Sequence, residues 1–232
     1  MRFRFACAVV SLASVLGADV ALAQQQSLNF SLGYFTIRGE DARVEGDALV
    51  VNRDLYVFDF KDFNGPSIGA DYLVALGDYF EVGGGIGFSS RAVDTIYDDF
   101  VRPDGTEIEQ QLKLRVVPMT ATVRVLPLGH TTPFQPYVGG GIGVYNWRYS
   151  ETGDFVDFTV PGRPIFRESY VASGTSLGPV AVFGLRFPVG NATVGGEVRY
   201  QRAEGDLDER DFLGPKIDLG GIHYSATVGF RW

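Results

Sequence analysis

The chain has 232 residues, a formal net charge of −8 at neutral pH and one cysteine, Cys7. An acidic chain without a basic block argues against a nucleic-acid partner, and a single cysteine excludes internal disulfides. Its 30 glycines, 18 phenylalanines and 11 tyrosines accompany few lysines and few helix-favouring stretches, which points away from a helical protein.

Residues 1–23 have the layout of a secretory signal peptide. Arg2 and Arg4 give a basic start, an apolar run follows, and Ala21-Leu22-Ala23 is a small-x-small cleavage site. The apolar run is too short to span a bilayer, which takes roughly 20 residues. We therefore expect export and a single mature domain over residues 24–232. No later apolar run approaches the length of a transmembrane helix, so the open alternatives are a soluble exported protein and an outer-membrane β-barrel.

Eight segments of strand character follow along the mature chain. The last, GIHYSATVGFRW, alternates apolar and polar residues over all twelve positions. A strand in a soluble sandwich usually has about 5–6 residues, whereas a membrane-spanning strand needs about 9–11. In SIGADYLVAL and TVGGEVRYQ the ionisable residues likewise lie opposite the aliphatic ones, as expected if one face meets lipid and the other a polar lumen. The predicted strands are residues 27–38, 65–76, 79–92, 111–126, 134–149, 175–188, 192–203 and 219–232.

The fourth of these segments breaks the alternation. In LKLRVVPMTATVRVL the apolar residues change from even to odd positions at Pro118. Because proline cannot donate to the hydrogen-bond ladder and is tolerated at bulges, the pattern predicts a β-bulge near Pro118.

The connections between these segments alternate in length. Those at 77–78, 128–133 and 189–191 are short, and those at 39–64, 93–110, 150–174 and 204–218 are long. Short turns on one side and long loops on the other are typical of outer-membrane barrels, with the short turns in the periplasm. The sequence therefore predicts an all-β fold, an eight-stranded antiparallel up-and-down transmembrane β-barrel with both termini on the periplasmic side.

The motif VGGGIG occurs twice, at 82–87 and 138–143. A dinucleotide-binding loop would need a helix directly after the glycines, but strand-like sequence follows both copies. We expect the glycines at alternate positions to face a narrow lumen and to leave room for larger side chains. These glycines are Gly83, Gly85, Gly87, Gly139, Gly141 and Gly143.

The chain ends in FRW, with apolar side chains at alternate positions before it, and this end resembles the signal that outer-membrane barrels present to their assembly machinery. The stretch PYVGGGIGVYNW is similar to strands of the small outer-membrane β-barrel superfamily, which includes the OmpA transmembrane domain, OmpW, OmpX and the opacity proteins. The resemblance implies a monomer without a cofactor in the outer membrane of a Gram-negative-type bacterium. It also implies contact with outer-membrane lipid and lipopolysaccharide, and with the barrel assembly machinery and periplasmic chaperones. The residues of the expected assembly signal are Tyr224, Ala226, Val228, Phe230 and Trp232.

Six charged residues are expected on the inward faces of the strands. Unpaired charges in a narrow interior are costly, so they should form ion pairs that plug the bore; a thin gated ion path is the alternative. The expected lumen network consists of Asp71, Glu81, Arg115, Arg186, Glu197 and Arg199.

We expect a non-enzymatic protein with a structural or surface-interaction role carried by acidic extracellular loops. An OmpW-like channel for small hydrophobic solutes is the main alternative. Carboxylates in 93–110 and 204–218 suggest Ca²⁺ or Mg²⁺ binding as a further alternative, but no EF-hand spacing occurs, so no metal ligands are assigned. The apolar loop 150–174 is expected either to extend the barrel as a hairpin or to contact a hydrophobic ligand or partner.

A remote enzymatic alternative comes from His223 and Ser225, which share a strand face. The stretch HYS resembles part of the active site of PagL, an outer-membrane lipid A deacylase with a His/Ser/Glu triad. In that family an asparagine of the oxyanion hole follows, where this chain has Ala226, and no carboxylate follows His223.

Overall fold

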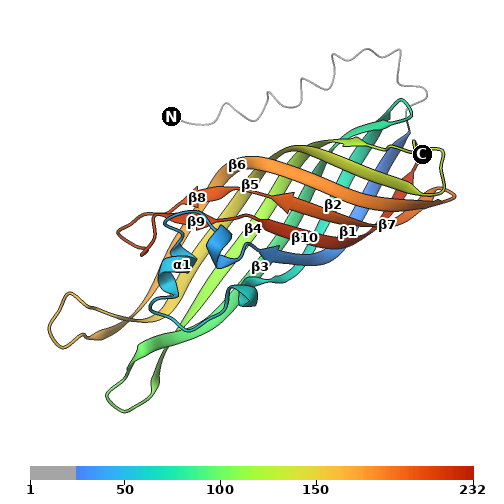
Figure 1. Cartoon of the computed structure of the whole chain (residues 1–232). Coiled ribbons are helices and arrows are strands. Elements are labelled where there is room, and N and C mark those ends of the chain that lie inside the picture. The colour runs from blue at the N-terminus through green and yellow to red at the C-terminus, as the bar shows by residue number, and fades with distance from the viewer. Residues whose placement is uncertain (1–24) are drawn as a thin grey trace.

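The computed structural model describes residues 25–232 and shows a closed antiparallel barrel of eight strands (Figure 1). Strands that follow one another in the chain are neighbours in the barrel, and the last strand pairs with the first to close it. The predicted fold class is therefore confirmed. Residues 1–23, predicted to be a signal peptide, lie outside the described residues. The barrel strands are β1 (Gln26–Ile37), β2 (Gly65–Leu76), β3 (Phe80–Val101), β4 (Glu107–Val125), β5 (Gln135–Val156), β6 (Ile165–Val189), β7 (Ala192–Gln201) and β10 (Gly221–Arg231).

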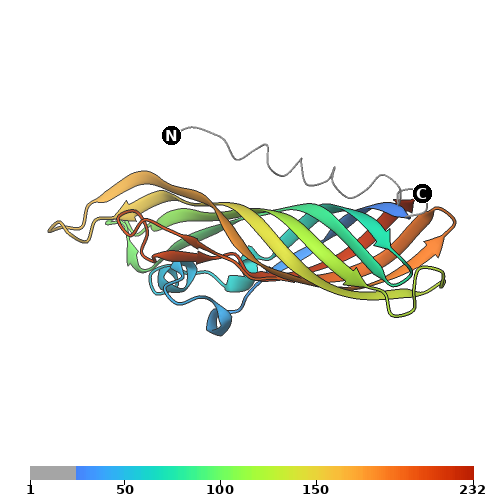
Figure 2. The ribbon, with the colours of Figure 1, turned by 90° about the horizontal axis from the view of Figure 1, so that it is seen from above.

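The two ends of the barrel differ, as the loop lengths predict. Short turns join β2 to β3, β4 to β5 and β6 to β7 at one end, which we call the periplasmic end. The same end holds the start of β1 and the end of β10, where Ser27 lies opposite Arg231. The long connections gather at the other, extracellular end (Figure 2).

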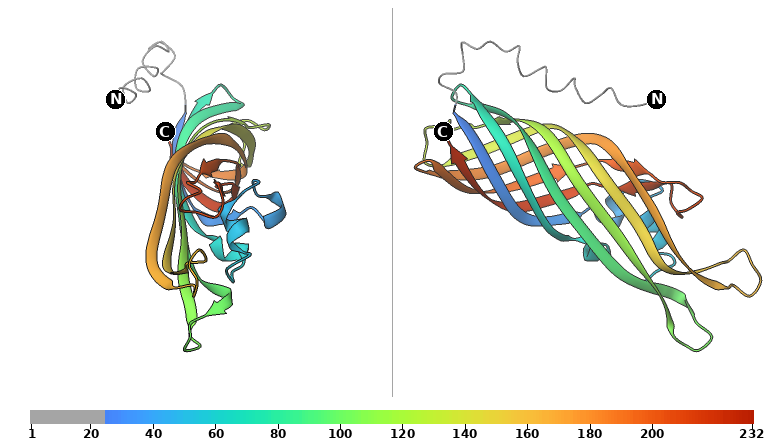
Figure 3. Two further views of the ribbon diagram at one scale, coloured as in Figure 1. Left: turned by 90° about the vertical axis from the view of Figure 1, so that its left-hand side faces the viewer. Right: turned by 180° about the vertical axis from the view of Figure 1, so that it is seen from behind.

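Four of the strands are much longer than the others. The strands β3 to β6 have 19 to 25 residues, whereas β1, β2, β7 and β10 have 10 to 12. They continue past the barrel rim as two hairpins that form one curved wall (Figure 3). Residues 93–110 and 150–174, expected to be loops, are therefore largely strand. Of the two alternatives for 150–174, the structure shows the hairpin that extends the barrel, with Val156 opposite Ile165 near its tip.

The two remaining long connections fold against the concave side of this wall. Residues 38–64 contain the short helices η1 (Glu40–Ala42), α1 (Ala48–Asn52) and η2 (Phe60–Phe63), and residues 202–220 contain the two-stranded sheet of β8 (Glu204–Asp206) and β9 (Lys216–Asp218). Together with the upper wall they form a structure that we call the head.

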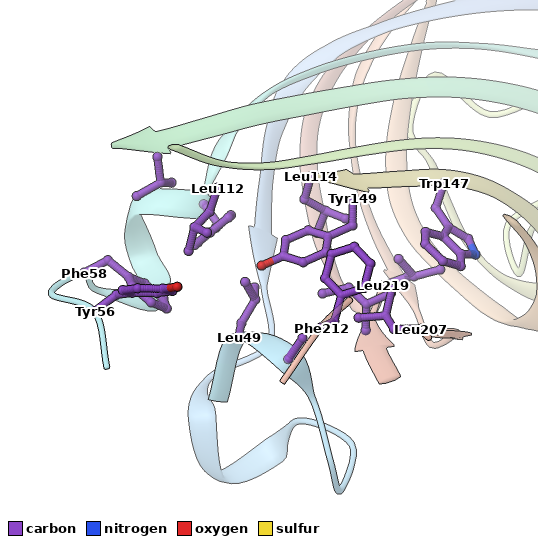
Figure 4. Packing of buried hydrophobic residues seen from close by; sticks show 14 of the residues in the cluster. Leu49, Tyr56, Phe58, Leu112, Leu114, Trp147, Tyr149, Leu207, Phe212 and Leu219 are labelled. Atoms are coloured by element: carbon purple, nitrogen blue, oxygen red, sulfur yellow. The ribbon is translucent and has the colours of Figure 1, made fainter. Parts of the chain in front are cut away.

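The head has an apolar core of its own (Figure 4). Leu49 from α1 and Leu219 after β9 pack beside Tyr149 of the wall, and all three are almost completely buried. The fully or largely buried core residues are Ala48, Leu49, Tyr56, Phe58, Phe63, Val93, Tyr97, Ile108, Leu112, Leu114, Val116, Tyr145, Trp147, Tyr149, Val156, Ala203, Leu207, Phe212, Ile217 and Leu219.

The predicted bulge at Pro118 is wrong. The pairing of β4 with β5 continues without a register shift, with Val116 opposite Trp147 and Pro118 opposite Tyr145. The even-numbered residues of β4 face inward along the whole strand, but their side chains change from mainly apolar to polar at Pro118. Above Pro118 it presents buried Leu112, Leu114 and Val116 to the head, and below it presents buried Thr120, Thr122 and Arg124 to the lumen.

The outer face of the barrel changes in the opposite sense. On β4, Met119 and Val123 are exposed below Pro118, and Lys113 and Arg115 are exposed above it. The outer surface is apolar below Pro118 and polar above it, as expected for a strand that passes from lipid into water. The inversion therefore marks the upper edge of the lipid-facing band. Large exposed apolar residues of that band include Phe30, Leu32, Ile68, Tyr72, Ile86, Phe88, Val138, Ile142, Leu177, Phe183, Val194, Val228 and Phe230.

Within residues 25–232, no helix has both the length and the apolar character needed to cross a membrane.

Candidate functional site

The interior of the lower barrel is filled by charged side chains. The guanidinium of Arg199 on β7 lies 2.8 Å from Asp71 Oδ2 on β2 and 2.7 Å from Glu197 Oε1. Arg124 on β4 lies 3.2 Å from Glu197 Oε2 and 3.6 Å from Asp71 Oδ1. These two arginines and two carboxylates form a single cluster, which we call the lumen network.

A second ion pair lies beside it. Arg186 Nη2 on β6 donates to Glu81 Oε1 on β3 at 2.7 Å. Tyr137 on β5 links the two groups, because its hydroxyl donates to Glu197 Oε2 at 2.9 Å while the guanidinium of Arg186 lies 5.2 Å from its ring centre. Arg124 lies 5.0 Å from the same ring centre. An aromatic ring with two guanidinium groups at these distances gains cation–π attraction from both.

Three of these ion pairs, Arg199–Asp71, Arg124–Glu197 and Arg186–Glu81, cross the barrel interior. In the closed order of the strands, β7 and β2 are separated by β10 and β1, β4 and β7 by β5 and β6, and β3 and β6 by β4 and β5. Each pair thus joins walls that are nearly opposite each other in a ring of eight. The three arginines balance the three carboxylates, and all six side chains are at most 13% exposed. This arrangement places paired charges across the interior of the lower barrel.

Five of the six residues expected in the lumen lie in these ion pairs. Arg115 does not: it is exposed on the outer face of β4, above the lipid-facing band. Arg115 faces outward because its apolar neighbours Leu114 and Val116 face the core of the head and not lipid. Arg124 and Tyr137 were not expected in the lumen. Arg124 could have been identified from the sequence, because it shares a strand face with Thr120 and Thr122 while apolar Val123 lies on the other face.

The alternate glycines of the two VGGGIG motifs lie on the inward face, where an added Cβ would come within 3.0 Å of a neighbouring atom. They are Gly83, Gly85, Gly87, Gly139, Gly141 and Gly143. A Cβ on Gly85 would lie 2.1 Å from Asp71 Oδ1, and one on Gly141 would lie 1.9 Å from the Ala121 carbonyl oxygen. Both distances are far below van der Waals contact. Glycine at Gly85 in particular leaves the space that the carboxylate of the lumen network occupies.

His223 and Ser225 both point inward but are bound to other groups. Ser225 Oγ donates to the Glu197 carbonyl oxygen at 3.3 Å, and His223 Nε2 lies 3.2 Å from Gln201 Oε1 while its ring stacks on Phe35 with centroids 4.3 Å apart. Within the described residues the two side chains form no hydrogen bond with each other. The geometry gives no support to a deacylase dyad at the lipid face.

The residues of the expected assembly signal all lie on the outer face of β10 or just after it. Tyr224, Val228, Phe230 and Trp232 are about half exposed, and Ala226 lies exposed among them. Among residues 25–232, no group of three or more His, Cys, Asp or Glu side chains is arranged to hold a metal ion.

An ionic clasp joins the two head connections. Arg43 donates to both carboxylate oxygens of Asp47 at 3.0 and 2.9 Å and to the Asp218 carbonyl oxygen at 3.1 Å. The Asp218 carboxylate in turn binds Arg38 at 2.9 Å and accepts from the Val44 amide at 3.0 Å. The side chains of Arg43, Asp47 and Asp218 are fully buried, so the clasp fixes residues 38–64 to residues 202–220.

Comparisons with known proteins find similarity in structure alone. No protein-family model matches the chain, and no curated protein matches it significantly in sequence. Among solved structures, it is similar to the outer membrane protein OprG from Pseudomonas aeruginosa, with 14% identity and a TM-score of 0.49 over 90% of this chain and 95% of that one. It is also similar to the attachment invasion locus protein Ail of Yersinia pestis, with 13% identity and a TM-score of 0.45 over 91% and 100% of the chains. Neisserial surface protein A matches with 12% identity and a TM-score of 0.45 over 90% and 99%.

The molecule's own geometry defines its class. A sheet closed into a ring of eight strands removes every edge within the membrane, an apolar band surrounds it, and the ionisable groups face inward. These features are those of a transmembrane β-barrel of the outer membrane.

Proposed function

We propose that this protein is a non-conducting, non-enzymatic outer-membrane barrel that supports the head as a surface-interaction module. The ion pairs across the lumen are the observation that carries the proposal: Arg124, Arg186 and Arg199 each bind a carboxylate on a distant strand. Opening a path for ions or solutes would separate buried charges, which costs several kcal/mol per broken pair.

The construction of the head supports the same proposal. Four strands are prolonged well beyond the membrane, and two long connections are packed and clasped onto them. The outward surface of the head is acidic, with exposed carboxylates along 204–211 and 93–109. A rigid, acidic, folded surface suits recognition of an extracellular partner better than gating of a pore.

Conductance in planar bilayers tests the closed bore. We expect no steady unitary currents from the purified protein, while an Arg124→Ala/Arg199→Ala double variant should conduct because two cross-barrel groups are removed. An Arg53→Ala variant, which changes an exposed head residue, is the matched control. Steady unitary currents from the wild type would support the OmpW-like transport alternative instead.

Contact with lipopolysaccharide is supported by a basic patch directly above the lipid-facing band. Arg115 on β4 and Arg148 on β5 are cross-strand neighbours on the outer face, with Lys113 next to them. Like charges directly opposite each other destabilise a sheet, and phosphate groups between them would reverse the effect. An Arg115→Ser/Arg148→Ser variant should retain less lipopolysaccharide on purification, as measured by mass spectrometry; unchanged retention would refute the assignment.

A further inference from the structure

A cavity of about 210 Å³ opens between the wall and the connection 202–220 near the top of the head. Its walls are largely aromatic, and the rings contact one another around it. Tyr56 meets Tyr97 with centroids 4.9 Å apart, Phe155 meets Tyr170 at 5.1 Å, and Tyr170 meets Phe212 at 6.4 Å. Arranged in this way, aromatic faces and edges line much of a small space that is open to solvent on one side.

One carboxylate lies among these rings. Glu151 on β5 lines the cavity and is only 3% exposed. Its Oε1 accepts hydrogen bonds from Asn52 Nδ2 at 2.7 Å and from the Tyr149 hydroxyl at 2.8 Å. Within the described residues, Oε2 accepts no hydrogen bond and no lysine, arginine or histidine lies within 4.0 Å of the carboxylate.

The cationic side chain among the residues that line the cavity is already bound elsewhere. Arg210, on the lip of the cavity, is largely exposed and holds the Asp208 carboxylate at 2.6 Å. Glu209 and Asp211 beside it add negative charge to the same lip. The cavity therefore combines a buried acceptor that lacks a cation with an acidic entrance.

We propose that this cavity binds a small organic ammonium ion with an apolar or aromatic body. An N–H of the ammonium group would donate to Glu151 Oε2 and complete a charge-assisted hydrogen bond. The aromatic rings that line the cavity would add cation–π attraction to the same cation. A buried carboxylate is costly unless paired, so the site favours a cation over a neutral or anionic molecule of the same shape. The volume lies below that of typical drug-sized pockets, which start at about 300 Å³, so the ligand is a small amine.

This inference deepens the proposed function, since it rests on the head being the part that binds, and it names the ligand class. Phenethylammonium is a suitable probe, with 2-phenylethanol as the neutral analogue of equal shape. Titration calorimetry should use the full barrel in a nonionic maltoside detergent, because zwitterionic detergents carry ammonium groups of their own. We expect phenethylammonium to bind at least about tenfold more tightly than 2-phenylethanol, the factor that a single charged hydrogen bond supplies.

Two variants and one control assign the interaction to residues. Glu151→Gln keeps the oxygen that Asn52 and Tyr149 bind but removes the charge, and it should abolish the preference for the amine. Tyr170→Leu keeps the wall apolar but removes a π face, and it should weaken the amine more than the alcohol. Glu168→Gln changes an exposed carboxylate on the adjacent strand and should have no effect.

Equal binding of the two probes, an amine preference that survives Glu151→Gln, or no binding to folded wild-type protein would each overturn the assignment. Heat-modifiable migration on gels establishes that the barrel of every variant is folded, and protease resistance of residues 38–64 establishes the same for the head. The proposal of a closed bore is tested separately by conductance, so a negative result in this experiment does not bear on it.

Discussion

Arg124 of β4 and Glu197 of β7 meet inside the barrel, with the guanidinium 3.2 Å from the carboxylate and both side chains at most 4% exposed. Glu197 also holds Arg199 at 2.7 Å and accepts from Tyr137. This carboxylate is therefore the group on which the lumen network converges, and it determines how the opposite walls are tied together.

Removing that carboxylate should destabilise the barrel strongly. Glu197→Ala leaves Arg124 without its nearest carboxylate and leaves Arg199 with Asp71 as its remaining carboxylate partner. Loss of one member of a buried ion pair costs about 3–5 kcal/mol, so urea unfolding in lipid vesicles should shift to much lower concentration. Glu107→Ala, at an exposed position near the tip of the β3–β4 hairpin, should leave the transition unchanged. Equal stability of the two variants would show that the network contributes little.

Gly140 and Gly141 are adjacent in the chain but face opposite sides of the barrel wall, so alanine substitutions at the two positions can be compared. A methyl group on Gly141 would lie 1.9 Å from the Ala121 carbonyl oxygen, whereas one on Gly140, which faces outward, would lie 3.4 Å from the Val180 carbonyl oxygen. Gly141→Ala should cost about 1–3 kcal/mol or more through overpacking, and Gly140→Ala should fold like the wild type. The fraction that shows heat-modifiable migration after refolding measures both. A similar yield for the two variants would contradict the close approach of the strands.

The ionic clasp should control the stability of the head. Arg43→Ala leaves the buried Asp47 carboxylate without its guanidinium, and we expect residues 38–64 to become sensitive to protease while the barrel stays intact. Arg53→Ala removes a more exposed pair with Glu40, which is worth about 0–1 kcal/mol, and should change little. Mass spectrometry of limited digests locates the cuts; identical digestion of the two variants would mean that the clasp does not hold the head.

The head should loosen as pH rises. Burial raises the pKa of Glu151 above its usual range, although hydrogen bonds from Asn52 and Tyr149 partly offset this. Because the folded head binds the proton more tightly than the unfolded chain, Glu151 favours folding at low pH, and this contribution is lost as pH rises through its raised pKa. Tyr149, Tyr56 and Tyr170 nearby also have raised pKa values, so they stay neutral over this range.

Hydrogen exchange of the amides in 38–64 measures this effect in the absence of ligand. The protection of the wild type, relative to Glu151→Gln at the same pH, should fall from mildly acidic to mildly alkaline conditions. A constant ratio between the two proteins would contradict a pKa raised by burial.

The strand period was enough to predict the barrel, because membrane-spanning strands must alternate along their whole length, as GIHYSATVGFRW does. The same rule does not hold above the membrane. Leu114 is apolar because it faces the core of the head. If apolar residues always faced lipid, Leu114 would point outward, which would require a bulge at Pro118 and an inward Arg115. The head itself depends on contacts such as that between Arg43 and Asp218, which are distant in sequence and follow no local period. Glu151 could not be recognised for a similar reason, since the rings around it come from several separate segments.

The most direct test concerns the height on β5 at which the wall leaves the membrane. Residues 25–232 contain no cysteine, so single cysteines at Ile142 and Arg148, which both face outward on β5, can carry nitroxide spin labels in vesicles. We predict that the label at Ile142 collides with oxygen, which concentrates in lipid, and that the label at Arg148 collides with a water-soluble nickel chelate. Labels that are both in water or both in lipid would contradict a barrel whose wall rises out of the membrane to carry the head.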